Sequence, residues 1–127
     1  MTRFTKNFKV SELACHDGMP VPQEYYENAK AICENAQVLR DLLGTPLYVV
    51  SGYRTLSHNT KVGGVQNSYH LTASALDLKS HHWEPEQLAT LYKGLIRMGL
   101  VSDGGVGYYP ESGFIHVDIG RPRRWVG

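Results

Sequence analysis

The stretch SYHLTASALDLK, residues 68–79, decides the fold, because its second half alternates like a strand that is apolar on one face only. In its ALDLK end, Leu76 and Leu78 point to one side of the strand and Asp77 points to the other. His70 precedes this strand by a short bend and can fold back over the face that carries Asp77. The question is what a histidine and a carboxylate do in a segment where apolar residues would pack better.

A second run, FIHVDI (114–119), alternates in the same way, with His116 and Asp118 on the face opposite its isoleucines and valine. If the two strands are neighbours in one sheet, Asp77 and His116 lie within roughly 5 Å of each other. Together with His70 they form a zinc-ligand set, and three protein ligands leave a fourth position open, as in catalytic zinc sites. A single histidine on a strand is more often solvated or hydrogen-bonded. The prediction of a metal site therefore depends on these residues occurring together with the sequence around them.

The surrounding patterns predict an α+β fold with a small, mainly antiparallel sheet flanked by helices, in a single domain of residues 1–127. The helices follow from apolar residues at three- and four-residue spacing, and the last two strands form a hairpin around the turn PESG. The expected elements are a short helix or turn at 8–14, helices at 23–43 and 84–100, strands at 47–53, 75–79, 106–109 and 114–119, a polar, turn-rich segment at 55–67, and a short basic tail.

Composition and charge exclude several classes of function. A net charge of +1 over 127 residues argues against a nucleic-acid surface built on bulk charge. No apolar run has the length of a membrane span, so we expect no membrane insertion. The N-terminal MTRFTKNFKVSEL lacks the apolar stretch of a signal peptide. Cys15 and Cys33 are too few for a disulfide scaffold, and we expect two free thiols in a monomer.

The motifs around the two histidines resemble a known family, the M15 group of zinc peptidases, and most closely its small, phage-associated branch. The resemblance spans about residues 47–125. It implies an M15/hedgehog-like zinc peptidase fold and hydrolysis of an amide bond in the stem peptide of bacterial peptidoglycan, by a D,D-carboxypeptidase or an L-alanyl-D-glutamate endopeptidase. The motifs, in chain order, are VSGYRT (50–55), Asn59, Gly63–Gly64, SxHxxAxAxD (68–77), GxxHVD (113–118) and PRRW (122–125).

Carried over residue by residue, the resemblance implies that Zn²⁺ binds to His70, Asp77 and His116. Arg54 matches the family's substrate-positioning arginine, whose guanidinium would clamp a substrate carboxylate or the oxyanion of a tetrahedral intermediate. Ser68 either supports the ligand or substrate geometry by hydrogen bonding or only caps a loop.

Two further residues near the motifs have alternative roles. Asp118 either orients a ligand imidazole from behind or pairs with one of the tail arginines at positions 121, 123 and 124. Tyr109, or its neighbour Tyr108, is expected to line the cleft and contact substrate. We read His81–His82 as a solvated loop and Cys15–His16–Asp17 as a structural cluster.

The chain departs from the family pattern at two places. Ala73 stands where the family has a glycine, and at a positive φ an alanine costs about 1 kcal/mol. The family's acidic general base lies three residues before the last zinc histidine, and its second histidine two residues before it, but here these positions are Gly113 and Phe114. The nearest acid is Glu111 on the expected turn, which makes it the candidate base.

The missing acid leaves a rival function open. A non-catalytic, zinc-bearing module could bind the cell wall, or a structural zinc domain could serve in a phage particle. The lack of a signal peptide fits a protein that stays in the cytoplasm until it is released to the cell wall, as an endolysin is, and fits a virion-associated protein equally well.

Overall fold

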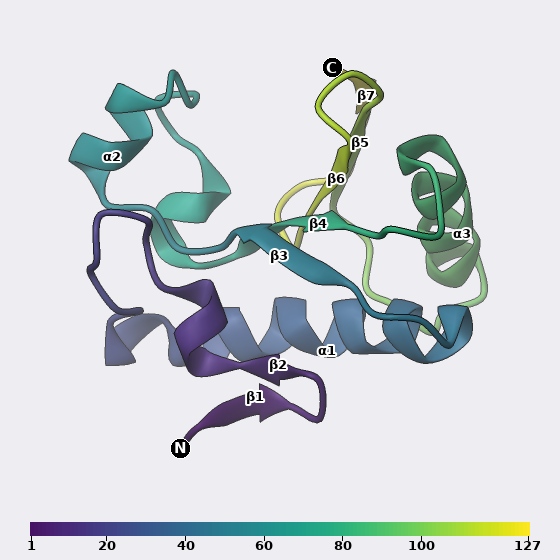
Figure 1. The fold of residues 1–127 in the computed structure, drawn as a ribbon, viewed down its shortest axis with the longest axis horizontal. Coiled ribbons are helices and arrows are strands. Elements are labelled where there is room, and N and C mark those ends of the chain that lie inside the picture. Colours follow the sequence, from purple (N-terminus) through teal and green to yellow (C-terminus); the bar gives the residue numbers. More distant parts are fainter.

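A five-stranded sheet forms the centre of the computed structural model, which describes residues 1–127 (Figure 1). The strands are β3 (Tyr48–Ser51), β4 (Ala75–Lys79), β5 (Gly105–Tyr109), β6 (Phe114–Asp118) and β7 (Arg123–Val126). They lie in the order β3-β4-β6-β5-β7, and only the pairing of β5 with β7 is parallel. The predicted α+β fold with a mainly antiparallel sheet is therefore confirmed.

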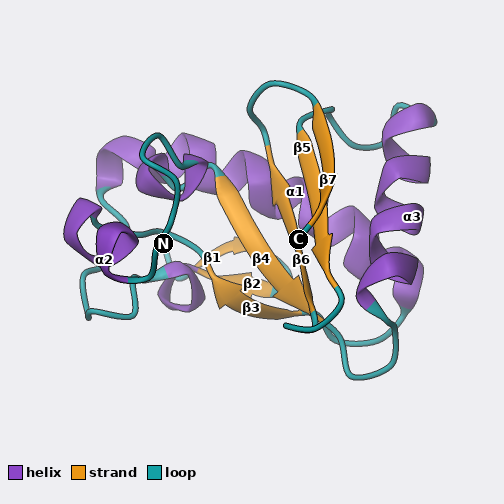
Figure 2. Ribbon diagram, turned by 90° about the horizontal axis from the view of Figure 1, so that it is seen from above, coloured by secondary structure: helices purple, strands orange, loops and turns teal.

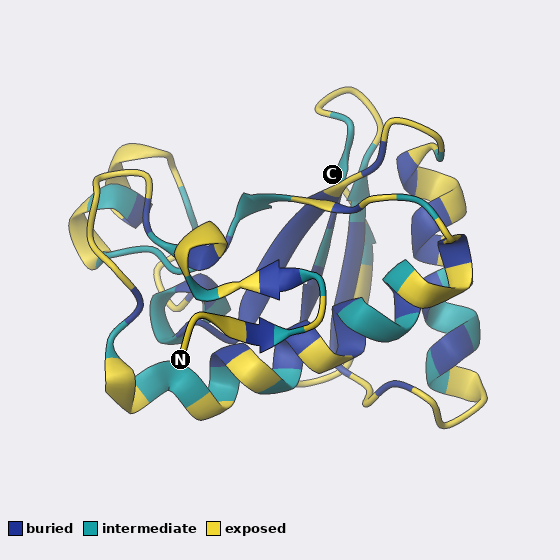
Figure 3. Cartoon of the chain, turned by 60° about the horizontal axis from the view of Figure 1, so that its bottom comes forward, coloured by how far each residue is buried: buried dark blue, intermediate teal, exposed yellow.

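Two helices, α1 (Tyr26–Leu43) and α3 (Pro85–Arg97), supply most of the apolar cover of the sheet. Helix α1 packs against β4 and helix α3 against β5 and β6, and Figure 2 shows both helices beside these strands. The apolar residues of β4 and β6 are fully buried in this core, as the alternation predicts: Leu76, Leu78, Ile115 and Val117. Figure 3 shows the sheet mostly in the colour of buried residues. The opposite face of β4 and β6 is thereby left to carry the polar residues.

The ends of the two helices follow from local sequence. Helix α1 ends before Gly44, which adopts the left-handed conformation at φ 67°. Helix α3 starts with a proline at its first position, after a capping box between Glu84 and Gln87. None of the helices is long and apolar enough to cross a bilayer.

The N-terminal segment adds a small hairpin of β1 (Arg3–Thr5) and β2 (Phe8–Lys9), which packs on α1. A 3-10 helix, Val10–Leu13, follows it and agrees with the short helix or turn expected at 8–14. A second short 3-10 helix, Gln23–Tyr25, precedes α1.

The expectation of a polar, turn-rich segment at 55–67 missed a short helix, α2, at Leu56–Lys61. Thr55 starts this helix, since its hydroxyl oxygen accepts a hydrogen bond from the backbone N–H of His58 at 3.2 Å. The remaining residues, 62–67, form the expected irregular loop around Gly63 and Gly64.

The expectation of a short basic tail is wrong, because residues Arg123–Val126 form strand β7 beside β5. Gly107 lies opposite Trp125 in this pair, and a Cβ at Gly107 would overlap the indole ring. Gly105 lies opposite Arg123, and a Cβ there would overlap its guanidinium. The two glycines of GVG therefore let large side chains of β7 lie across β5, toward β6.

Candidate metal centre

Three side chains of the types that can bind a metal ion converge on the polar face of the sheet. Asp77 of β4 lies directly opposite His116 of β6, and His70 comes from a 3-10 helix, Tyr69–Thr72, that leads into β4. Asp77 Oδ1 lies 3.0 Å from His116 Nδ1 and 3.3 Å from His70 Nε2. One ligand atom from each of the three residues lies within 4.8 Å of the others. Asp77 and His116, which the strand alternation brings to one face, thus meet each other and His70 in the structure.

The position of His70 follows from the two ends of its 3-10 helix. The hydroxyl oxygen of Ser68 caps the helix by accepting the backbone N–H of His70 at 3.2 Å. Ala73 ends the helix in the left-handed conformation at φ 56°, the conformation that the family's glycine implied. The imidazole donates its Nδ1–H to the carbonyl of Gly52 at 2.6 Å, which leaves Nε2 as the atom that faces Asp77.

The orientation of His116 is set by Asp118, whose side chain is fully buried. Asp118 Oδ2 lies 2.8 Å from His116 Nε2 and 2.7 Å from Arg123 Nη2. The backbone N–H groups of Gly105 and Gly120 donate to its other oxygen, at 2.8 and 2.9 Å. Both roles that we considered for Asp118 are therefore present, because it supports His116 from behind and pairs with an arginine.

The charges of this cluster perturb the pKa values of its members. Burial alone would raise the pKa of Asp118, but the hydrogen bonds from His116 and Arg123 hold it well below its usual range. Burial would likewise raise the pKa of Asp77, yet hydrogen bonds with His116 and His70 hold it low. Burial would lower the pKa of His116, but its bonds to Asp118 and Asp77 raise it. Without a cation, the cluster therefore favours a protonated His116 between two carboxylates.

Arg54 is bound to the cluster itself. Its Nη2 donates to Asp77 Oδ2 at 3.2 Å, its Nε to Ser51 Oγ at 3.1 Å, and its Nη1 to Asn59 Oδ1 at 3.2 Å. Its side chain is 16% exposed. Arg54 therefore fixes the carboxylate oxygen of Asp77 that points away from the histidines, in addition to any contact with a substrate.

Asn59 connects Arg54 to the neighbouring loop, residues 62–67. Asn59 is almost fully buried, and its Nδ2 donates to the carbonyl of Val65 at 2.9 Å. A Cβ at Gly64 would overlap the amide of Asn59, which explains why the loop carries a glycine there. This asparagine thereby fixes both the arginine and the loop.

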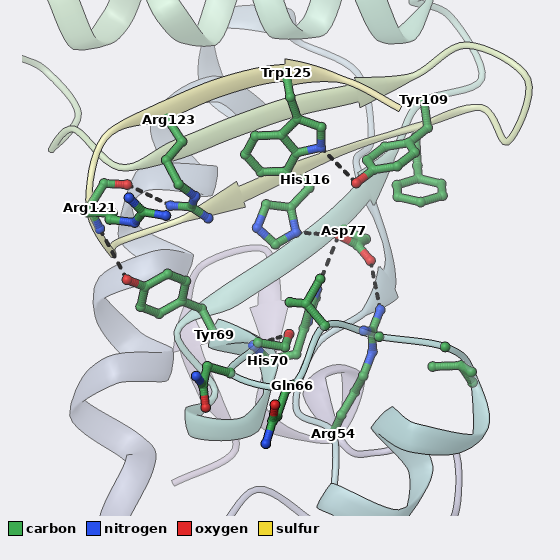
Figure 4. A pocket seen from close by; sticks show the side chains of 17 residues that line it. Arg54, Gln66, Tyr69, His70, Asp77, Tyr109, His116, Arg121, Arg123 and Trp125 are labelled. Carbon is green, nitrogen blue, oxygen red and sulfur yellow. Dashed lines mark hydrogen bonds and ion pairs between the residues drawn. The ribbon is translucent and has the colours of Figure 1, made fainter.

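A cavity of about 910 Å³ opens over the three converging residues. Figure 4 shows Gln66, from the loop 62–67, and Trp125 on opposite sides of His70 and His116. Tyr109 and Phe114 also line the cavity, with stacked rings 4.6 Å apart. The indole N–H of Trp125 donates to the hydroxyl of Tyr109 at 2.8 Å, and the indole ring lies 5.1 Å from the imidazole of His116.

Glu111 is not among the residues that line this cavity, so the structure does not bring the expected base to the cluster. It is exposed in the turn of the β5–β6 hairpin. Tyr109 and Phe114 form the last pair of that hairpin, which puts the turn one step beyond them and farther from His116. Asp77 is the only carboxylate among the cavity-lining residues.

Of the residues flanking the cluster, the sequence analysis located Ser68, Tyr109 and Asp118 and named Arg123 among three possible partners of Asp118. It gave no role to Asn59 and did not place Trp125 beside His116. Arg123 and Trp125 occupy alternate positions in β7, opposite the alternate glycines of β5. This matching period of two was the signal available in the sequence.

The remaining polar clusters lie outside the cavity. His81 and His82 are exposed, and the ring of His81 packs on Tyr48 at 4.7 Å. Asp17 accepts a hydrogen bond from Thr55 at 2.6 Å, which connects its loop to the start of α2 and agrees with a structural role. Both cysteines are buried, free thiols, as expected.

The residues present fit a zinc ion. Two imidazoles and one carboxylate are a common catalytic zinc-ligand set. Each imidazole has its other nitrogen tied to a protein oxygen, from Gly52 for His70 and from Asp118 for His116, as metal-ligating histidines usually do. His70 would bind through Nε2, Asp77 through Oδ1 and His116 through Nδ1.

Comparisons with known proteins agree with this site. The chain is 38% identical over 94 residues to the peptidoglycan L,D-endopeptidase MepK of Escherichia coli. The aligned region covers 68% of this chain and 48% of the relative. It is 36% identical over 98 residues to the probable peptidoglycan L,D-endopeptidase MepK of Haemophilus influenzae, and this alignment covers 73% of this chain and 50% of the relative. The chain spans about half the length of these curated relatives. A family model described as peptidase M15 matches residues 3–118, a range that includes all three converging residues, and the chain therefore belongs to the peptidase M15 family.

Proposed function

We propose that this chain is a zinc-dependent peptidase that hydrolyses an amide bond in the stem peptide of bacterial peptidoglycan. The observation that carries the proposal is the convergence of His70, Asp77 and His116 beneath a cavity of about 910 Å³ in a chain of the M15 family. Zinc bound there would supply a Lewis acid for the scissile carbonyl and would lower the pKa of a water molecule to about 7.

Between the two activities that the sequence implies, we propose the endopeptidase. Both relatives are named as L,D-endopeptidases, and neither is named as a carboxypeptidase. The substrate would then be an internal bond between an L- and a D-residue of the stem peptide.

The chain's own residues would prepare the site in two ways. Arg54 holds one oxygen of Asp77, which leaves the other oxygen directed at both histidines. Asp118 holds the Nε2–H of His116, which keeps Nδ1 directed into the cluster. The three hydrogen bonds of Arg54 also leave one N–H on each of Nη1 and Nη2 for a substrate oxygen.

A second candidate function rests on a specific observation. Asp77 is the only carboxylate that lines the cavity, and Arg54 and both histidines already engage it. A peptidase gains roughly 10²–10⁴-fold from a positioned general base. Without a second carboxylate the chain could instead be a zinc-bearing module that binds wall peptide and leaves it intact.

The two functions are separated by incubating zinc-loaded protein with purified peptidoglycan and analysing the soluble products by mass spectrometry. The peptidase releases stem-peptide fragments, and neither the chelated protein nor the His116→Ala variant does. The binding module instead co-sediments with the insoluble wall in a zinc-dependent way and releases nothing. Absence of both release and co-sedimentation overturns both functions.

A further inference from the structure

The cavity wall carries more positive than negative charge. Its lining includes three arginines, Arg54, Arg121 and Arg123, and one carboxylate, Asp77. A second carboxylate, Asp118, lies fully buried behind His116. An anionic group on a ligand would therefore meet a favourable potential on this wall, before any metal adds its own charge.

Two of the three arginines already have acidic partners. Arg54 binds Asp77. Arg123 donates to Asp118 Oδ2 at 2.7 Å and to the carbonyl of Arg121 at 2.6 Å. Its guanidinium also lies 5.2 Å from the ring centroids of Tyr69 and of Trp125. The fixed bonds of these two side chains position the site and leave them little freedom to follow a ligand.

Arg121 differs, because its guanidinium makes no hydrogen bond, ion pair or cation–π contact within the chain, although it lines the cavity. Its backbone is nevertheless anchored. The backbone N–H donates to the hydroxyl of Tyr69 at 3.4 Å (Figure 4). Gly120 packs so closely on the Tyr69 ring that a Cβ would overlap the ring, and Pro122 restricts the backbone conformation of Arg121. An anchored backbone thus presents a free cation at the cavity rim.

We propose that Arg121 binds a carboxylate of the substrate and thereby selects stem peptides whose acidic residue carries a free carboxylate over those in which it is amidated. The inference rests on the proposed function, since it names the substrate form that the same cavity takes. The planar guanidinium can donate two parallel N–H bonds to a carboxylate, whereas a carboxamide offers one oxygen and no charge. A charge-assisted bond of this kind corresponds to about tenfold or more in affinity.

The test uses two synthetic stem peptides of one sequence, with the acidic residue either free or amidated. The zinc-loaded wild type is expected to cleave the free form with a kcat/KM about tenfold higher than the amidated form. Arg121→Gln is expected to lose this preference through a higher KM for the free form, with kcat and zinc content unchanged. Arg121→Lys should retain part of the preference, because lysine keeps the positive charge but lacks the planar guanidinium that donates two parallel hydrogen bonds.

The matched control is Arg97→Gln, which removes the same charge from an exposed position at the end of α3 that does not line the cavity. This variant should keep the wild-type preference. Equal cleavage of both peptides by the wild type, or an unchanged preference in Arg121→Gln, overturns the role of Arg121 while the peptidase function stands.

Failure of the peptidase function has a different signature, namely no turnover of either peptide by the zinc-loaded wild type. In that case the equilibrium dissociation constants of the two peptides for the wild type and for Arg121→Gln decide the role of Arg121. Tighter binding of the free form that disappears in the variant supports it. Equal binding of the two peptides by the wild type contradicts it.

Discussion

His116 donates its Nε2–H to Asp118 Oδ2 at 2.8 Å, and this bond directs its Nδ1 to Asp77 Oδ1, 3.0 Å away. An ionised carboxylate only accepts hydrogen bonds, so the proton on Nε2 is fixed by its partner. Two residues on the same face of β6 thereby select the nitrogen of His116 that a metal would find.

The first prediction concerns this pair. Asp118→Asn removes the charge that holds the imidazole, and we expect zinc affinity to fall about 10–100-fold, as for other residues that orient a ligating histidine. Competition with a chromophoric chelator measures the affinity, and circular dichroism checks the fold. Asp103→Asn is the control, since Asp103 is exposed and pairs with Arg124 away from the cavity. Equal zinc affinities for Asp118→Asn and wild type would contradict the role.

The second prediction concerns the pH dependence of stability in the metal-free protein. The pKa of His116 is raised above 6.5 on folding, so its contribution is fully present below pH 6.5 and is lost as the pH rises through the folded-state pKa. The pKa values of Asp77 and Asp118 are lowered below 3.8, so their contributions are present above pH 3.8 and are lost on acidification. The free energy of unfolding should therefore decrease as the pH rises above 6.5.

Urea unfolding in the presence of a chelator measures this decrease, and His116→Gln should flatten the profile above pH 6.5. Zinc must displace the Nδ1 proton of His116, so zinc affinity should increase over the same pH range. A metal-free wild type that becomes more stable from pH 6.5 upward would show that His116 is not held as an imidazolium by its two carboxylates.

The third prediction concerns the close packing of β7 on β5. Gly107→Ala places a Cβ in the space of the Trp125 ring, so we expect the indole to move, with a change in tryptophan fluorescence and a loss of turnover. Gly94→Ala in α3 is the matched control, because the nearest atom to its new Cβ is 3.8 Å away. It should be neutral or stabilise the helix by up to about 1 kcal/mol. Identical spectra for Gly107→Ala and wild type would contradict the packing.

Much of the site could be predicted from the alternation within two short strands. ALDLK and FIHVDI each place leucine, isoleucine or valine on the core side, and this fixes the faces that carry Asp77 and His116. The pairing of the two strands then brings the side chains together. Local alternation was sufficient here because a shift of one residue would have buried the charged face.

The contribution of the last residues could not be predicted in the same way. RPRRW contains three arginines and reads as a short basic tail. Its pairing with β5 depends on space left by Gly105 and Gly107, earlier in the sequence. Arg54 shows a second limit of the sequence. Its motif predicts a residue near the substrate, but only the folded chain shows that it is bonded to Asp77.

The fourth prediction concerns Glu111, which the sequence favoured as the base. Because Glu111 is exposed in the hairpin turn and does not line the cavity, Glu111→Gln should leave zinc content and kcat/KM on a stem peptide unchanged within about twofold. A loss of about 10²-fold, the effect of removing a general base, would mean that the turn reaches the site during turnover.

The central claim is that His70, Asp77 and His116 bind one zinc ion. The most direct test is the zinc content of purified wild type, His116→Ala and His82→Ala, measured by inductively coupled plasma mass spectrometry. His82 is exposed and does not line the cavity, so its variant controls for the loss of a histidine. We predict about one zinc per chain in wild type and His82→Ala, and loss of most of it in His116→Ala, with the helices and the core retained. An unchanged zinc content in His116→Ala, or a wild type that binds no zinc, would contradict a metal centre of His70, Asp77 and His116.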